Sequence, residues 1–210
     1  MKTPVSPLLA LAIAAFVPGV VSQEVSPDAL VKNITQEVLT IIKHDKDIQA
    51  GQAKKVVELV QTRILPHFNF TRMTQSAMAR NWRIATPEQQ QALTREFKTL
   101  LVRTYSTALS NYRDQAIEYR PLRATANDTD VTVKSEVRQA GAQSVTIDYE
   151  MEKTAAGWKV YDVKVGGVSL ITTYRETFAS EVRERGVDGL IKALAAKNRQ
   201  GDARFGVSNT

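Results

Sequence analysis

Residues 131–165 read VTVKSEVRQAGAQSVTIDYEMEKTAAGWKVYDVKV, and this stretch decides the fold class. Apolar and polar residues alternate in two runs, 131–138 and 145–152, that are separated by a short glycine-containing turn. Such alternation predicts two antiparallel strands with one apolar face and one solvent-exposed face. A second turn, at 155–157, leads into a third run of strand-forming residues, 158–165. We therefore expect an antiparallel meander.

The third run changes phase along its length. Trp158 and Val160 share one phase, whereas Tyr161, Val163 and Val165 share the other. Either a β-bulge moves the two sets onto one face, or both faces of the strand are covered. We favour the bulge, and the side of the sheet that each residue faces stays open at this point.

Residues before and after the meander show helical periodicity, with apolar side chains recurring every three or four positions. The clearest start is at 86–89, where Thr86 can cap, Pro87 fits the first turn and Gln89 can complete a capping box. Gly186 is expected to end the first helix after the sheet. We expect helices near 26–44, 52–65, 69–79, 87–112, 169–185 and from 187 onward, and a short strand at 116–119. This order predicts an α+β fold, with helices packed on one face of a curved antiparallel sheet.

The first 22 residues have the pattern of a secretory signal peptide. Lys2 precedes an apolar run, 8–17, which is followed by a break at 18–19 and by small or branched residues at 20–22. The apolar run is about half of the roughly 20 residues that a membrane span requires. We expect residues 1–22 to be removed on export, residues 23–200 to form a single domain, and residues 201–210 to be a disordered tail.

Composition excludes several kinds of chemistry. The 210-residue chain has no cysteine, which rules out thiol catalysis, cysteine-ligated zinc and iron–sulfur clusters. Its net charge of +6 is compatible with anionic lipid surfaces, but the basic residues are too dispersed to indicate nucleic acid. His44 and His67 lie in different segments without carboxylates at metal-binding spacing. The residues alone leave open whether the large apolar interior is filled or holds a ligand.

The segment 158–178, WKVYDVKVGGVSLITTYRETF, resembles the MlaC family of periplasmic phospholipid-binding proteins, also called toluene-tolerance auxiliary proteins. The segments 68–77, 82–90 and 186–198 are also similar to that family, so the resemblance spans nearly all of the chain after the signal peptide. The family often has an acid where Asn69 stands, a Gly where Ala79 or Arg80 stands, and a Glu near Gly166. These departures concern local turns and leave the apolar positions unchanged.

The resemblance implies a non-enzymatic periplasmic carrier with no cofactor, whose cargo is phospholipid. It implies an apolar pocket between sheet and helices that takes acyl chains, and transport between outer and inner membranes that maintains outer-membrane lipid asymmetry. The implied partners are an inner-membrane ABC transporter complex with an MCE-domain ring and an outer-membrane lipoprotein–porin complex. We expect a monomer that binds no nucleic acid.

The expected pocket wall combines apolar positions of the strands with those of the flanking helices. These residues are Phe97, Leu100, Leu101, Tyr105, Val133, Val145, Ile147, Tyr149, Tyr161, Val163, Val165, Leu170, Tyr174 and Phe178. Tyr161 and Tyr174 are expected to place hydroxyl groups near the pocket mouth, and Trp158 to be structural. Core packing is the alternative role for each residue of the expected pocket wall. Two other functions stay open: an interaction module with a filled core, and an enzyme using polar groups such as His67 or Asp162.

Overall fold

The structure is a computed structural model, and it describes residues 25–110, 112, 115–125, 127–139, 141 and 143–205. The expected signal peptide, residues 1–22, lies outside the described residues, as does the end of the expected tail, 206–210. No helix of the described part is long and apolar enough to cross a membrane.

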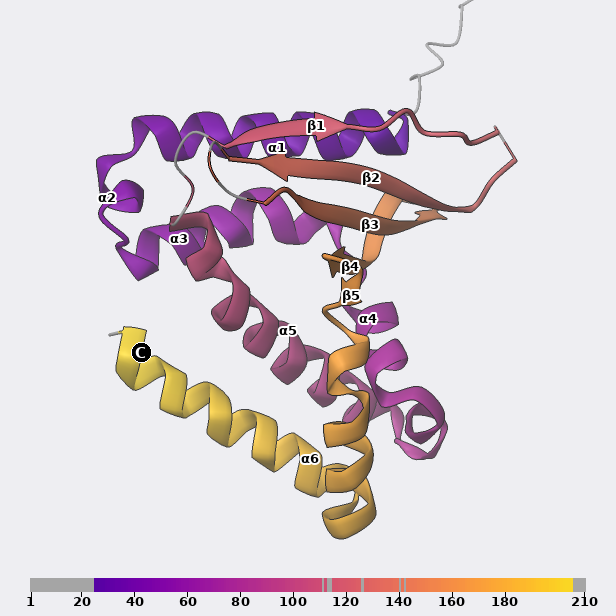
Figure 1. Ribbon diagram of the computed structural model, residues 1–210. Helices are drawn as coiled ribbons and strands as arrows, with labels where there is room; N and C mark the ends of the chain where they lie inside the picture. Colours follow the sequence, from indigo (N-terminus) through magenta and orange to yellow (C-terminus); the bar gives the residue numbers. More distant parts are fainter. Residues whose placement is uncertain are drawn as a thin grey trace, which may run out of the picture.

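The sheet is the expected antiparallel meander, in which each strand pairs with the next along the chain (Figure 1). Its strands are β1 (Ala116–Tyr119), β2 (Asp130–Arg138), β3 (Val145–Thr154), β4 (Gly157–Val165) and the short β5 (Val168–Ser169). The polar phase of the strands forms a solvated outer face with ion pairs between neighbouring strands. In one of these, the Arg138 guanidinium lies 3.1 Å from the Glu118 carboxylate. The α+β class is thus confirmed.

A bulge in β4 resolves the phase change of the third run. Glu150 pairs with Asp162 and Met151 pairs with Val160, so Tyr161 is the extra residue of the bulged strand. The bulge places Val160 and Val163 on the same, inner face of the sheet, where both border cavities. The favoured interpretation of the sequence is confirmed.

The helices lie on the inner face and below the end of the sheet (Figure 1). They are α1 (Pro27–His44), α2 (Lys46–Gln49), α3 (Ala53–Leu59), α4 (Phe70–Met78), α5 (Pro87–Ser110) and α6 (Arg175–Phe205), with short turns between them. The capping box at the start of α5 is formed, because the Gln89 N–H donates to Thr86 Oγ1 and the Thr86 N–H donates to Gln89 Oε1. Gly186, with φ of 70°, interrupts α6 where the sequence predicts a helix end.

Three segments differ from the sequence predictions. The helix expected over 52–65 is α-helical only over α3 and continues as a π-helical turn, Val60–Ile64, and a 3-10 turn, Leu65–His67, because Pro66 has no N–H to donate to the preceding turn. The helix expected from residue 169 begins at Arg175, because Ser169 belongs to β5 and its hydroxyl accepts from the two N–H groups of a turn. At its other end α6 continues to Phe205, past the expected start of the tail at residue 201.

The apolar interior is divided into three clusters. One lies among α4, α5 and α6, one between α1 and the sheet, and one among α1, α2 and α3. Within the first, Phe97 packs edge-on against Tyr174 and Phe178, with ring centroids 5.0 and 5.1 Å apart. The helical half packs on itself in this way, and apolar residues on the inner face of the sheet, such as Ile147 and Val163, border open space.

Candidate functional site

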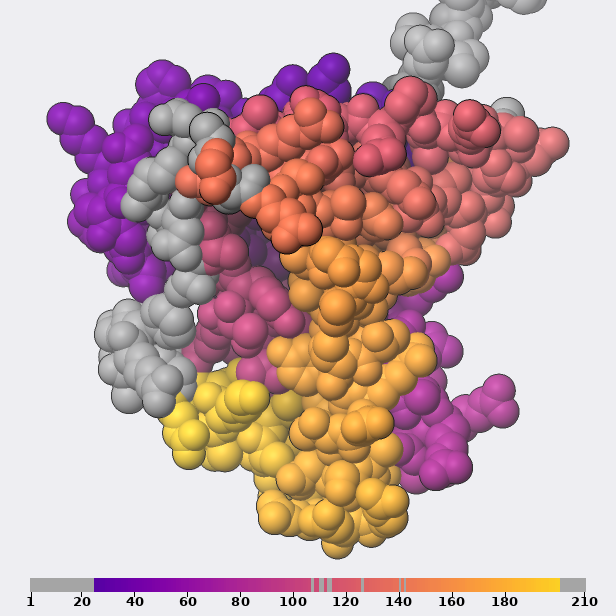
Figure 2. All heavy atoms as spheres, in the orientation of Figure 1, coloured from indigo at the N-terminus to yellow at the C-terminus, as the bar shows by residue number. Residues whose placement is uncertain are grey.

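Two adjoining cavities occupy the space between the sheet and the helices, with volumes of about 400 and 270 Å³. The larger, cavity 1, lies among α1, the end of α5 and the inner face of the sheet. The smaller, cavity 2, lies among α5, the π-helical turn and the ends of β3 and β4. Both are bordered by the same five residues, Ile64, Phe68, Leu109, Ile147 and Tyr149. In Figure 2 the surface is hollowed between α5 and the end of the sheet.

The lining of both cavities is almost entirely apolar. Among the described residues of the lining, His67 is the only one that can carry a charge at neutral pH, and it borders cavity 1. Burial, followed by the nearby Lys159, lowers the pKa of His67, which favours the neutral imidazole. Burial also raises the pKa values of Tyr105 and Tyr149 to about 12, so both phenols stay protonated. Such a lining suits an uncharged, apolar part of a ligand.

Half of the expected wall residues border these cavities. They are Leu101, Tyr105, Ile147, Tyr149, Val163, Val165 and Leu170. Contact between any of these side chains and a lipid stays a prediction.

The other expected wall residues lie elsewhere. Phe97, Leu100 and Phe178 are buried among the helices, where Tyr174 packs against them, and Val133 is buried between α1 and the sheet. Val145, at the start of β3, is 41% exposed and lines neither cavity. A helical stripe therefore marks apolar positions without showing which of them meet another side chain.

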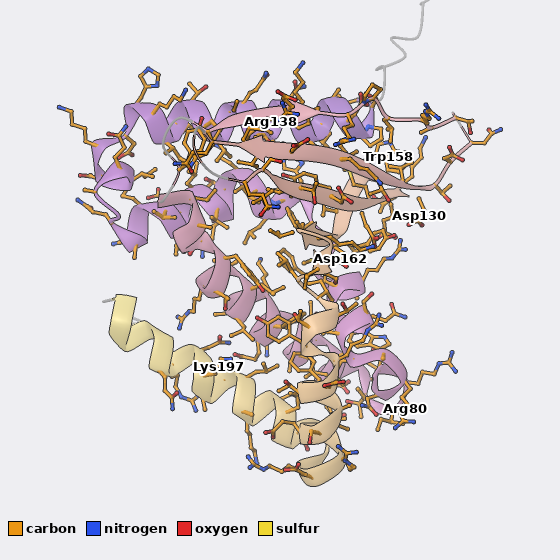
Figure 3. The ribbon with its side chains drawn as sticks, viewed as in Figure 1. Arg80, Asp130, Arg138, Trp158, Asp162 and Lys197 are labelled. Carbon is orange, nitrogen blue, oxygen red and sulfur yellow. The ribbon has the colours of Figure 1, made fainter. Side chains whose placement is uncertain are left out.

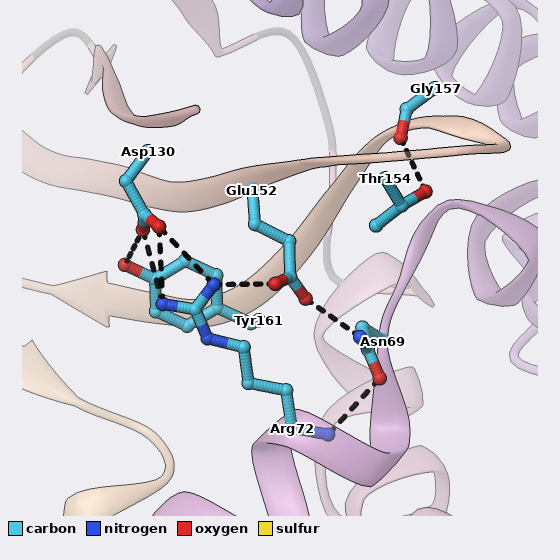
Figure 4. Close-up of polar contacts among 7 residues, drawn as sticks. All are labelled: Asn69, Arg72, Asp130, Glu152, Thr154, Gly157 and Tyr161. Carbon is cyan, nitrogen blue, oxygen red and sulfur yellow. Dashed lines mark hydrogen bonds and ion pairs between the residues drawn. The ribbon is translucent and has the colours of Figure 1, made fainter. Parts of the chain in front are cut away.

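Tyr161 lies outside the cavities because the bulge turns it to the outer face of the sheet. Its hydroxyl donates to Asp130 over 2.6 Å, and the Arg72 guanidinium stacks over its ring at 3.5 Å (Figure 4). The expectation that Tyr161 places a hydroxyl at the pocket mouth is not what the structure shows. Residue patterns could not place it, because a bulged residue has no partner that fixes its direction.

Much of the far wall of cavity 1 was not predicted from the sequence. That wall comes from α1, through Leu30, Ile34, Val38 and their neighbours, and from Phe68 before α4. The helical spacing of the α1 residues is visible in the sequence and predicts an amphipathic helix. Nothing in that spacing tells whether the apolar face meets a strand or an open space.

Polar groups gather on the outer side of the sheet rather than in the cavities. Arg72, on α4, bonds Glu152 over 2.6 Å and Asp130 over 3.1 Å, and Asn69 donates to the same Glu152 over 2.7 Å (Figure 4). We call Asn69, Arg72, Asp130, Glu152 and Tyr161 the clasp, because they join α4 to β2, β3 and β4. The charged groups of the clasp are paired with one another, which indicates a structural role.

Asp162 and His67, the candidates for acid–base chemistry, do not converge. Asp162 is 6% exposed, lies where the sheet meets the helices (Figure 3), and accepts from the Ser169 hydroxyl over 2.5 Å. Burial raises the pKa of the Asp162 carboxyl, and its hydrogen bonds act against that shift. Asp162 lines neither cavity. Across the described residues, no group of three or more histidines and acids could hold a metal ion.

Fold and site together define a class of α+β proteins that enclose an uncharged cavity between a curved antiparallel sheet and its helices. A family model described as MlaC protein matches residues 32–196. The chain therefore belongs to the MlaC family.

Relatives and a solved structure agree with this assignment. Toluene tolerance protein ttg2D of Pseudomonas putida is 26% identical over 181 residues, covering 86% of this chain and 83% of the relative. The intermembrane phospholipid transport system binding protein MlaC of Haemophilus influenzae is 23% identical over 180 residues, covering 81% of each chain. A phospholipid-binding protein from Ralstonia solanacearum, solved in complex with a phospholipid, is 46% identical with a TM-score of 0.76. That match covers 83% of this chain and 97% of the Ralstonia chain.

Proposed function

We propose that this protein is a phospholipid carrier that holds acyl chains in the two adjoining cavities. The observation that carries the proposal is the lining, whose described residues are apolar except for several hydroxyl groups, the Gln115 amide and the His67 imidazole. The Ralstonia relative, whose structure contains a phospholipid, supports the same ligand class.

The physical chemistry of such a site requires no metal, cofactor or charged anchor. Transfer of one methylene from water to an apolar environment is worth about 0.8 kcal/mol, so a chain of about sixteen carbons gains on the order of 12 kcal/mol. The headgroup can then remain in solvent. An enzyme would need polar groups that converge on the ligand, and in the part of the lining that the structure describes His67 is the only side chain that can be charged at neutral pH. The protein is therefore proposed to act without catalysis.

The cellular role follows from the slow release that so apolar a site implies. We propose that residues 1–22 direct export to the periplasm, where the protein moves phospholipid between outer and inner membranes and maintains outer-membrane lipid asymmetry. Release would then depend on partners that open the cavity. The proposed partners are the inner-membrane MCE-domain ABC transporter complex and the outer-membrane lipoprotein–porin complex. The name of the Haemophilus relative, an intermembrane phospholipid transport binding protein, supports this role.

The first test is mass spectrometry of protein purified from the periplasm without detergent, under native conditions and then after solvent extraction. A diacyl phospholipid in stoichiometric amount is the expected result. A lipid-free protein that melts cooperatively and takes up no lipid from vesicles would instead favour the interaction module with a filled core.

The second test uses two variants on one strand. Ile147→Asn puts an amide into the wall shared by both cavities, and we expect it to abolish lipid retention because an unpaired buried amide is costly. Val145→Asn is the matched control, since Val145 is exposed and lines neither cavity. Circular dichroism and melting curves establish that both variants fold. Equal lipid retention by the two folded variants would place the ligand elsewhere.

A further inference from the structure

A cluster of hydroxyl groups interrupts the apolar wall of cavity 1. It consists of Thr35 on α1, Tyr119 on β1, Ser135 on β2 and Tyr149 on β3, and we call it the hydroxyl cluster. The strand register brings its members together, because Ser135 lies directly opposite Tyr119, and the neighbouring row pairs Val133 with Tyr149. The Tyr149 hydroxyl lies beside those of Ser135 and Thr35, and the Tyr119 hydroxyl lies beside that of Thr35. Thr35 and Tyr149 border cavity 1.

Two of the four hydroxyl protons of the hydroxyl cluster are donated to backbone carbonyls, which leaves the Thr35 and Ser135 oxygens as acceptors for the two phenols. Thr35 donates its proton to the carbonyl of Val31 over 2.8 Å, and Ser135 donates to the carbonyl of Ile147 over 3.1 Å. The hydroxyl protons of the two phenols, Tyr119 and Tyr149, remain to be placed. Tyr119 Oη is buried and has no hydrogen-bond partner in the part of the chain that the structure describes. A buried donor without an acceptor is unfavourable, so an oxygen atom that accepts from Tyr149, and leaves the Thr35 oxygen to Tyr119, would stabilise the cluster.

An acceptor can reach the cluster from cavity 1, because Thr35 and Tyr149 border that open space. A phospholipid placed in the cavity, as proposed above, brings ester carbonyl oxygens. Outside the headgroup its other oxygens are those that bridge each chain to glycerol, and these are weaker acceptors. A carbonyl oxygen that accepts from Tyr149 would leave the Thr35 and Ser135 oxygens free to accept from Tyr119. Tyr149 also borders both cavities, so an acyl chain leaving an ester group at this point can enter either one.

We propose that the hydroxyl cluster is an ester-binding site, in which the Tyr149 hydroxyl donates a hydrogen bond to an acyl ester carbonyl of the bound phospholipid. This inference rests on the proposed function. It adds a specificity: the protein selects lipids whose chains are joined through esters over lipids whose chains are joined through ethers, which lack the carbonyl. The raised pKa of Tyr149 keeps the donor protonated throughout the physiological range.

The test is competition between two lipids that differ only in the carbonyl. Delipidated protein is incubated with vesicles that contain equal amounts of dipalmitoyl phosphatidylglycerol and its dihexadecyl ether analogue, and the bound lipids are counted by mass spectrometry. Both lipids leave the same bilayer, so their bound ratio reports the preference of the site directly. We expect about a fivefold excess of the ester lipid, the effect of one hydrogen bond between neutral groups.

Variants of two tyrosines separate the ester site from general effects on the cavity. Tyr149→Phe should bring the bound ratio close to one while the amount of ether lipid bound stays the same. Tyr112→Phe is the control, because Tyr112 also borders cavity 1 but its hydroxyl already donates to the carbonyl of Gln115 over 3.2 Å. It should keep the fivefold excess.

The possible failures are distinguishable. A wild-type protein that binds both lipids equally, or a Tyr149→Phe variant that keeps the ester preference, overturns the ester site and leaves the carrier function intact. In the first case a bound water is the acceptor of the cluster. A wild-type protein that loads neither lipid overturns the carrier function itself.

Discussion

Ala79, at the end of α4, has φ of 48° and ψ of −126°, a backbone conformation that favours glycine. We predict that Ala79→Gly relieves this strain and raises the free energy of unfolding by about 1 kcal/mol. Melting temperature should rise by about 2 to 4 °C, the size expected for a chain of this length. The measurement is thermal unfolding of lipid-free protein, followed by circular dichroism.

Ala92→Gly is the matched control for that substitution. Ala92 lies within the helical α5, where glycine costs about 1 kcal/mol relative to alanine. The two variants should therefore shift the melting temperature in opposite directions. A drop in both would mean that the end of α4 does not hold Ala79 in a strained conformation.

Single residues also show where sequence reasoning reaches its limit. Phe97 and Leu101 stand on one stripe of α5, four residues apart, and the sequence treats them alike. Phe97 is buried against two aromatic rings of the helical half, whereas Leu101 lies one turn further on and borders cavity 2. Periodicity reports the side of a helix that avoids water, but the packing of distant elements decides whether that side meets another side chain.

At the scale of elements, the strands and most helices were predictable because their periods are strong. The alternation in β2 and β3 and the phase change at Tyr161 were sufficient to predict the meander and its bulge. The turns around Pro66 and Ser169 were not, because side-chain hydrogen bonds and a missing N–H compete there with helical periodicity. The joining of α4 to the sheet was also unpredictable, since it depends on contacts between residues far apart in the chain.

The clasp is the part of that joint that can be tested by mutation. Glu152 has a side-chain exposure of only 17%, so Arg72→Met leaves a largely buried carboxylate without its guanidinium partner. We predict a loss of about 2 kcal/mol in the free energy of unfolding, measured by urea titration of lipid-free protein.

Arg63→Met serves as the control for the clasp. Arg63 pairs with Glu37 over 3.0 Å, but both side chains are about half exposed, so the loss should stay below about 1 kcal/mol. Equal losses from the two variants would show that Arg72 is no more than another surface ion pair. A larger loss of unfolding free energy for Arg72→Met would show that the clasp holds α4 to the sheet.

At the scale of the whole molecule, the two halves meet around an apolar space rather than a continuous core. Acyl chains should therefore set the affinity, and the headgroup should matter little. Dihexanoyl and dioctanoyl phosphatidylglycerol both dissolve as monomers at low concentration, so their binding to delipidated protein can be compared by calorimetry without a bilayer. The longer lipid has about four more methylenes, worth up to about 3 kcal/mol, and we predict binding about 20- to 200-fold tighter.

Exchanging the headgroup provides the control for chain length. Dioctanoyl phosphatidylcholine has the same chains with a zwitterionic headgroup, and we predict a dissociation constant within about tenfold of that of the phosphatidylglycerol. The net charge of +6 favours the anionic lipid, but exposed charges are screened by salt, and no Lys or Arg among the described residues lines the cavities. A headgroup effect larger than the chain-length effect would mean that the surface of the protein, and not the space between its two halves, holds the lipid.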